Sequence, residues 1–132
     1  YMRFLRMILN RGTLAGKRIV SAETVDAMSQ NQIGAIRAGR MESVMPLLSE
    51  TFDPFPGMHC GWGLGFLINP GTGPEGRAAG SLAWAGLPNC YYWIDPASDL
   101  AGLVLMQFLP FADKAALRVL AAVESAAYRA VG

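Results

Sequence analysis

The 132-residue sequence predicts an α+β fold, in which helices precede and follow a set of antiparallel strands. Apolar residues recur at helical spacing near both ends of the chain, and the middle shows alternating or fully apolar segments that are typical of strands. Turns rich in Gly, Pro and Asp separate these segments. We therefore expect one unit with helices over 1–30, a loop over 31–60, strands over 61–108 and a helix over 113–130.

The N-terminal part predicts two helices joined by a small hairpin or loop over Thr13–Val20. The first helix covers residues 1–11, where Tyr1, Phe4, Leu5, Ile8 and Leu9 recur at helical spacing. Gly12 then suits the left-handed conformation that ends many helices. Ser21 is a good N-cap for the second helix, Glu23 complements its dipole, and the pattern ends near Gln30.

Three prolines and several glycines interrupt any regular pattern between Asn31 and Cys60, so we expect a long loop there. The alternation from Trp62 to Ile68 predicts one strand with a bulky face. Further strands are expected at Ser81–Gly86 and Cys90–Ile94, and the fully apolar Leu100–Phe108 reads as a central strand.

The last segment has the periodicity of a long helix that lies flat on the sheet. Its expected buried stripe consists of Leu117, Leu120, Val123 and Ala127. Its expected solvated residues are Lys114, Arg118, Glu124 and Arg129.

Composition excludes several function classes. The net charge is +1 and the basic residues form no run, so nucleic acid and membrane surfaces are not expected partners. Charged residues make up 16% and hydrophobic residues 52%, and the chain opens on Tyr1 within a helical pattern. We therefore expect the apolar faces to meet further polypeptide; a complete small domain is the alternative.

Most of the candidate chemistry has a simpler structural interpretation. Gly71–Gly76 matches Gly-x-Gly-x-x-Gly, but Pro74 interrupts it and a strand follows, so we expect a hairpin loop rather than a nucleotide site. His59 is expected to be a polar loop residue. Asp95 and Asp99 bracket a turn. Cys60 and Cys90 could form a disulfide, but two free thiols of a cytoplasmic protein are the default.

No serine of this chain lies in a nucleophile motif, and no metal or cofactor is implied. Acyl transfer, however, needs preplaced donors for the oxyanion, and a strand edge with small residues can present a backbone N–H. Ala85 and Gly86 would let a substrate approach the main chain, and Trp84 would form a flat apolar wall. The residues alone leave the alternative open that Trp84 is a core residue beside a bulge.

The order of these features resembles the C-terminal portion of serine β-lactamases and penicillin-binding-protein-like hydrolases, in particular the class C-like branch with the family VIII carboxylesterases. The segments that carry the resemblance are Tyr1–Gly12, Leu14–Ser21, Thr24–Met28, Gly61–Phe66 and Trp84–Gly86 with Tyr92–Pro96. Each motif alone is weakly specific for the family, but the order and spacing of the motifs are fairly specific.

The resemblance implies that Trp84 stands at the Lys position, Ala85 at the Thr position and Gly86 at the Gly position of the family's Lys-Thr-Gly motif. Leu87 would then offer an oxyanion-hole amide. Without the ammonium and hydroxyl groups that hold a substrate carboxylate, neutral esters or amides become more plausible substrates than β-lactams. Ala85 replaces the Gly that is usual in the esterases, which affects the width of the pocket.

The same resemblance implies that the Ser-x-x-Lys nucleophile motif and a second motif lie upstream, in a missing N-terminal part of the fold. We therefore expect this chain to be the C-terminal part of a serine acyl hydrolase, with residues 31–60 as the pocket rim and no activity of its own. The alternative is a non-catalytic relative that keeps the fold as an interaction or ligand-binding module.

Overall fold

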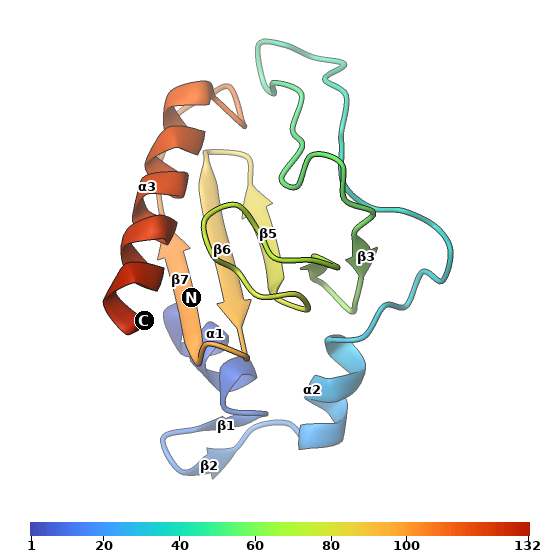
Figure 1. Ribbon diagram of the computed structural model, residues 1–132, viewed down its shortest axis with the longest axis vertical. Coiled ribbons are helices and arrows are strands. Elements are labelled where there is room, and N and C mark those ends of the chain that lie inside the picture. The colour runs from blue at the N-terminus through green and yellow to red at the C-terminus, as the bar shows by residue number, and fades with distance from the viewer.

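The computed structural model describes all residues from 1 to 132 and has the predicted α+β architecture (Figure 1). Its helices are α1 (Met2–Leu9), α2 (Ala22–Met28) and α3 (Lys114–Val131). Its strands are β1 (Thr13–Leu14), β2 (Lys17–Arg18), β3 (Gly61–Trp62), β4 (Leu67–Ile68), β5 (Leu82–Gly86), β6 (Cys90–Asp95) and β7 (Leu100–Val104). Strands β1 and β2 form the hairpin expected before α2.

A five-stranded sheet forms the centre of the molecule, and its strands follow the order β3-β4-β5-β6-β7. Every neighbouring pair is antiparallel. Helix α1 lies behind the sheet in Figure 1, and α3 covers the front face beside β7. The sheet is therefore the middle of three layers.

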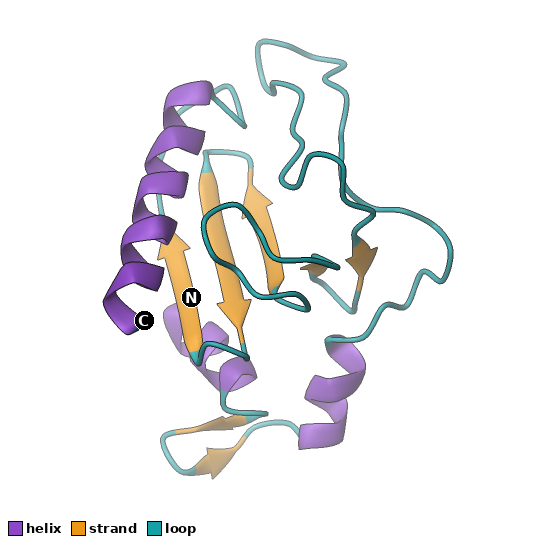
Figure 2. Ribbon diagram, viewed as in Figure 1, coloured by secondary structure: helices purple, strands orange, loops and turns teal.

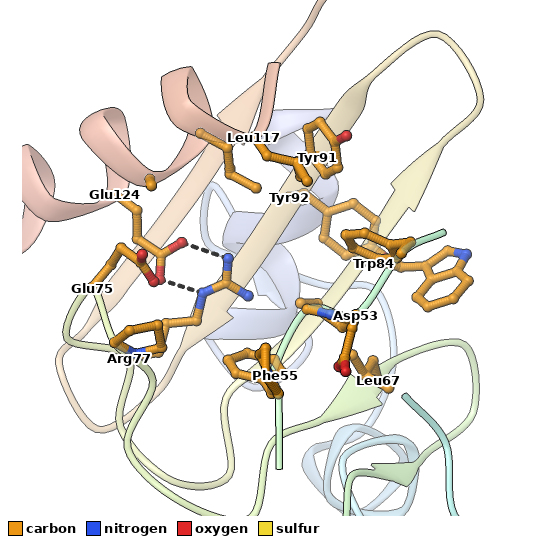
Figure 3. Close-up of a pocket in the computed structure, with 17 residues that line it drawn as sticks. Asp53, Phe55, Leu67, Glu75, Arg77, Trp84, Tyr91, Tyr92, Leu117 and Glu124 are labelled. Atoms are coloured by element: carbon orange, nitrogen blue, oxygen red, sulfur yellow. Dashed lines mark hydrogen bonds and ion pairs between the residues drawn. The ribbon is translucent and has the colours of Figure 1, made fainter. Parts of the chain in front are cut away.

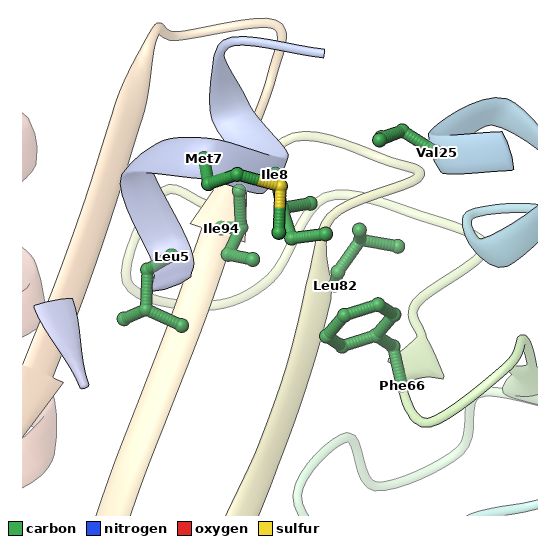
Figure 4. Close-up of a cluster of buried hydrophobic side chains, with 7 residues drawn as sticks. All are labelled: Leu5, Met7, Ile8, Val25, Phe66, Leu82 and Ile94. Atoms are coloured by element: carbon green, nitrogen blue, oxygen red, sulfur yellow. The ribbon is translucent and has the colours of Figure 1, made fainter. Parts of the chain in front are cut away.

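The two faces of the sheet bury different clusters because side chains alternate along each strand. On the α1 face, Leu82 and Ile94 lie opposite each other and pack with Leu5 and Ile8 of α1 (Figure 4). On the α3 face, Tyr91 packs with residues that include Phe111 and Ala116.

The predicted N-cap of α2 is confirmed. The hydroxyl of Ser21 accepts a hydrogen bond from the Thr24 N–H at 3.1 Å, which fixes the start of α2. The Asp113 carboxylate accepts from the N–H groups of Ala115 and Ala116 at the start of α3. Helix α2 ends at Met28, two residues before the predicted end.

Two predictions for the strands are wrong. The alternating segment from Trp62 to Ile68 is a tight hairpin of β3 and β4 rather than one strand, because Gly65 takes a left-handed conformation with φ of 100°. The expected central strand over Leu100–Phe108 ends at Val104 as β7, which lies at the edge of the sheet and pairs only with β6.

The predicted buried stripe of α3 is also partly wrong. Glu124 is buried with 3% of its surface exposed, whereas Val123 is 42% exposed. The buried side of the helix runs through Ala116 and Glu124, and it is flanked by the half-buried Leu117 and Leu120. The ion pair of Glu124 explains why a charge is tolerated there, as described below.

The long loop between α2 and β3 contains no helix and no strand (Figure 2), as predicted. Two isolated bridges lie within this loop, Ala38 to Cys60 and Met41 to Phe52, and a third joins its Ser49 to Phe111 before α3. Among the helices, none combines the length and the apolar character that spanning a membrane requires.

Candidate functional site

The Trp84–Gly86 segment forms the end of β5, where only one edge of that strand is paired. Strand β4 pairs with Leu82 and Ala83, whereas β6 continues alongside β5 up to Gly86. The other edge of β5 is therefore open along the three residues that the sequence singled out. An open strand edge of this kind presents backbone groups to a ligand.

Trp84 keeps its indole in a fixed position at this edge. Its ring centre lies 4.5 Å from that of Trp62, with the two planes at 82°, an edge-to-face arrangement. Phe55 and Leu67 belong to the apolar cluster against which both indoles pack. Trp84 is thus a half-buried wall rather than a fully enclosed core residue.

The turn after β5 carries the backbone amide of Leu87 and is fixed by Asn89. The Leu87 side chain is 52% exposed, and its backbone N–H donates to no backbone acceptor of the chain. Asn89 is fully buried and adopts φ of 60°, a conformation that Asn tolerates better than most residues. The turn can therefore hold a free amide donor in a defined place.

The side-chain amide of Asn89 forms hydrogen bonds through both its nitrogen and its oxygen. Its Nδ2 donates to the carbonyl oxygens of Phe108 at 2.9 Å and Pro110 at 2.8 Å. Its Oδ1 accepts from the Tyr91 hydroxyl at 2.8 Å and from the Asp113 N–H at 3.3 Å. The side chain thereby fastens the β5–β6 turn to the connection between β7 and α3.

A cavity of about 240 Å³ opens on the α3 face of the sheet, next to Trp84 (Figure 3). Its walls come from the loop at 52–56, the loop at 74–77, helix α3, and strands β4, β5 and β6. The aromatic residues that line it are Phe52, Phe55, Trp84, Tyr91 and Tyr92. The cavity is thus mainly apolar and is bordered by part of the long loop.

A buried ion pair forms one wall of this cavity. Arg77 Nε and Nη2 donate to the two carboxylate oxygens of Glu124 at 2.5 and 2.6 Å. The Arg77 guanidinium also lies over the rings of Phe55 and Trp93, at 5.5 and 5.3 Å from their centres. Since both charged side chains are nearly enclosed, each depends on the other for its solvation.

The phenols and the buried thiol near the site are poor proton acceptors. Burial raises the pKa of Tyr91 to about 12. Burial, followed by the neighbouring Tyr1, raises the pKa of Tyr92 above its ordinary value. Burial, followed by the nearby Asp53 charge, also raises the pKa of Cys60. These groups therefore stay protonated at neutral pH.

The predicted site residues do not all line one cavity. Trp84 borders the cavity described above, together with residues 52–56 of the predicted rim. Ala85 and Gly86 border a second, apolar cavity of about 300 Å³ beside Tyr1 and Leu103. Leu87 borders neither of the two. Trp84 and Ala85 thus point to different sides of the same strand end.

Three residues near the site, Asn89, Arg77 and Glu124, were not predicted from the sequence. Asn89 follows Pro88 in a hairpin turn, where Asn is a common residue of left-handed conformation. Glu124 lies four residues after Leu120 and seven after Leu117, on the apolar stripe itself, so its spacing could have marked it as buried. No sequence signal identifies Arg77 as its partner.

Comparison of the sequence with known proteins finds distant relatives. The chain is 32% identical over 116 residues to the uncharacterized protein MT1414 of Mycobacterium tuberculosis (strain CDC 1551 / Oshkosh) and equally to Protein Rv1367c of strain H37Rv. These matches cover 83% of this chain and 26% of each relative, so the chain spans about a quarter of their length. No family profile matches the chain.

Solved structures share the fold. The LovD6 mutant of simvastatin synthase (LovD) from Aspergillus terreus superposes with a TM-score of 0.77 at 25% identity, over 99% of this chain and 32% of that one. A penicillin-binding protein homologue from Caulobacter crescentus gives a TM-score of 0.58 at 18% identity, over 92% and 30% of the two chains. The chain therefore has the fold of the C-terminal portion of β-lactamase and penicillin-binding-protein-like enzymes.

Proposed function

We propose that the chain forms the C-terminal part of a serine acyl hydrolase that acts on neutral esters or amides. In this proposal Trp84, Ala85 and Gly86 line the substrate site, and the Leu87 backbone N–H is one donor of the oxyanion hole. The nucleophilic serine and its activating lysine, in a Ser-x-x-Lys motif, belong to polypeptide upstream of Tyr1. That upstream polypeptide is the partner that completes the site.

The observation that carries the proposal is the unpaired Leu87 N–H at the end of the half-open strand β5. The fold of the chain supports it, because serine enzymes with this fold use the corresponding strand edge. An oxyanion hole requires donors that are fixed before the reaction begins. The four hydrogen bonds of Asn89 supply that rigidity.

The chemical role of the chain follows from these positions. The serine hydroxyl passes its proton to the upstream lysine as its oxygen attacks the substrate carbonyl, and the carbonyl oxygen becomes an oxyanion that the Leu87 N–H stabilises. The bond to the leaving group then breaks, and the leaving group takes a proton from the upstream lysine. Water attacks the resulting acyl-enzyme, which releases the acid and restores the serine. An alcohol in place of this water would give acyl transfer to that alcohol.

The preference for neutral substrates follows from the side chains of Trp84 and Ala85 at the end of β5. Trp84 and Ala85 carry neither an ammonium nor a hydroxyl group, so this wall has no donor for a substrate carboxylate. The indole of Trp84 instead offers an apolar surface of fixed orientation. We therefore expect ester turnover to exceed turnover of carboxylate-bearing β-lactams.

The double variant Trp84→Lys, Ala85→Thr in the protein at its full natural length tests this proposal. Because it restores the two carboxylate-binding groups, we expect the ratio of β-lactam to p-nitrophenyl ester hydrolysis to rise by at least about tenfold. The control is Trp84→Phe, which keeps an apolar ring and should leave the ratio unchanged. An equal ratio in both variants would show that Trp84–Gly86 does not line the substrate site.

The non-catalytic alternative predicts a different result. In that case the full-length protein forms no covalent adduct with serine-directed acylating probes, and its upstream sequence lacks Ser-x-x-Lys. Mass spectrometry of the protein after incubation with an activated ester distinguishes the two functions. A mass increase by one acyl group that is lost on mutation of the upstream serine supports the hydrolase.

A further inference from the structure

The cavity beside Trp84 is large enough for a small organic molecule. Its volume is about 240 Å³, whereas an apolar cavity of about 150 Å³ is known to bind benzene. Five aromatic residues line it, and Ala83 and Trp84 of β5 belong to the same lining. An aromatic ring with a short side arm fits these dimensions.

Arg77 brings one free hydrogen-bond donor into this apolar space. Its Nε and Nη2 are bound to Glu124, which leaves Nη1 without a partner in the chain. In Figure 3 this third nitrogen lies on the side of the guanidinium that faces away from Glu124. The residue is only 7% exposed, and Nη1 is not among the fully enclosed side-chain atoms that lack a partner. Nη1 is therefore a donor that a molecule in the cavity can reach.

The charges around the cavity disfavour an ionic ligand. Glu124 already balances the positive charge of Arg77, and Asp53 and Glu75 add two carboxylates to the lining. An anion would meet these carboxylates, so Nη1 is not an anion site. A cation would compete with the Arg77 guanidinium, which already lies over Phe55 and Trp93.

We propose that this cavity binds the apolar part of a neutral molecule whose single acceptor oxygen, a ketone, ester or amide carbonyl, accepts a hydrogen bond from Arg77 Nη1. The inference deepens the proposed function, on which it rests, because it names the cavity as the subsite that selects the apolar arm of the substrate. Strand β5 links the two regions: Trp84 lies three residues before Leu87, which corresponds to roughly 10 Å along a strand.

The test uses the full-length protein and unreactive probes, so that binding is measured without turnover. Benzylacetone carries a phenyl ring and one ketone. Butylbenzene lacks the acceptor, hydrocinnamate is an anion of similar size, and phenylpropylammonium is a cation. Calorimetric titration should give saturable binding of benzylacetone and at least about tenfold weaker binding of each of the other three, since one hydrogen bond of this kind corresponds to about a factor of ten.

Matched variants on α3 locate the site. Ala121 lines the cavity, whereas its neighbour Ala122 is exposed. Ala121→Phe should weaken benzylacetone binding by at least about tenfold because the new ring occupies the cavity. Ala122→Phe should leave it within about twofold. Equal effects of the two variants would overturn the assignment.

The donor is tested by the double variant Arg77→Met, Glu124→Leu. Replacing both partners avoids an unpaired buried charge and generally preserves folding. Benzylacetone should lose its advantage over butylbenzene in this variant, and thermal unfolding verifies that the protein is folded. An advantage that persists would show that Nη1 does not bind the carbonyl.

The remaining outcomes separate this inference from the proposed function. Saturable, ketone-selective binding without any p-nitrophenyl ester turnover would support the ligand site and contradict the hydrolase. Turnover without saturable binding of benzylacetone, or with tighter binding of hydrocinnamate, would overturn the ligand site alone. A polypeptide segment that fills the cavity in the full-length protein would also abolish probe binding and thereby contradict the inference.

Discussion

Asn89 illustrates how one buried side-chain amide fixes the turn that carries the proposed oxyanion donor. Its side chain makes four hydrogen bonds, three with Phe108, Pro110 and Asp113 before α3 and one with Tyr91 of β6. A buried group that loses its partner costs about 1–3 kcal/mol. The residue therefore stabilises the fold and, in the proposed function, keeps the Leu87 amide in place.

Asn89→Gly keeps the left-handed backbone but removes all four hydrogen bonds. We expect the free energy of unfolding to fall by about 2–4 kcal/mol, measured by denaturant titration. The ester kcat of the folded variant should fall while KM changes little, because the oxyanion exists only in the transition state. A fall in stability with an unchanged kcat would confine Asn89 to a structural role.

The Asp95 carboxyl makes the stability of the folded protein depend on pH. Burial alone would raise the pKa of this carboxyl, but hydrogen bonds from the Ala78 N–H, the Tyr128 hydroxyl and Ser98 outweigh burial and lower it below its ordinary value. The carboxyl is fully enclosed, so this stabilisation is substantial. It is present above the ordinary Asp pKa of about 4 and is lost as pH falls through the lower pKa of the folded state.

Asp95→Asn should therefore lower stability at neutral pH and flatten its decline below about pH 4. Tyr128→Phe, which removes one donor to the carboxylate, should cost about 1.5–3 kcal/mol at neutral pH. Urea titrations between about pH 3 and 7 measure both effects. If the stability of Asp95→Asn falls as steeply with decreasing pH as that of the parent protein, other carboxylates cause the acid transition.

At the scale of the elements, local patterns predicted most of the helices and strands. Ser21 predicted the start of α2, and the strand expected over Ser81–Gly86 corresponds to β5. The single strand predicted over Trp62–Ile68 failed because the same alternation is compatible with a hairpin when Gly65 adopts a positive φ. Periodicity cannot distinguish these two arrangements.

The exposed and buried sides of α3 show a second limit of sequence patterns. Glu124 continues the apolar stripe through Leu117 and Leu120, but its charge predicted a solvent-exposed side chain. Only the three-dimensional position of Arg77, 47 residues away, makes burial possible. The cavity depends on the same long-range pairing, which explains why the candidate site was predicted only around Trp84.

The contact between β6 and β7 depends on the absence of a side chain at Gly102. A Cβ atom there would lie 2.0 Å from the six-membered ring of Trp93. Gly102→Ala should therefore lower the free energy of unfolding by about 1–3 kcal/mol through overpacking. Gly71→Ala is the control, because Gly71 has no positive φ and a Cβ there would only make ordinary contacts with Met58 at 3.8 Å. Chemical denaturation curves of the two variants provide the comparison.

At the scale of the whole molecule, exposed apolar side chains occur both in the long loop, where Val44 is 96% and Leu47 88% exposed, and near the unpaired edge of β7. Leu105 is 67% exposed and Phe108 42%, and Val119 on α3 is 49% exposed. Strand β7 pairs with β6 alone, so its outer backbone groups are available to another strand. In the proposed function, the upstream part of the fold covers this surface.

The 132-residue chain expressed by itself should consequently self-associate and should not hydrolyse esters. Size-exclusion chromatography with light scattering should detect dimers or larger species at micromolar concentration. Co-expression with the upstream polypeptide should suppress the association. A stable monomer that unfolds cooperatively would instead indicate that the chain needs no further polypeptide.

The Leu87 amide provides the most direct test of the proposed function. Leu87→Pro removes the N–H while the preceding Gly86 stays in an extended strand, which proline accepts. Leu87→Ala removes only an exposed side chain. In the full-length protein we predict that kcat for p-nitrophenyl ester hydrolysis falls roughly a hundredfold to a thousandfold in Leu87→Pro and stays within about threefold in Leu87→Ala. Equal rates in the two folded variants would contradict the role of this amide in the oxyanion hole.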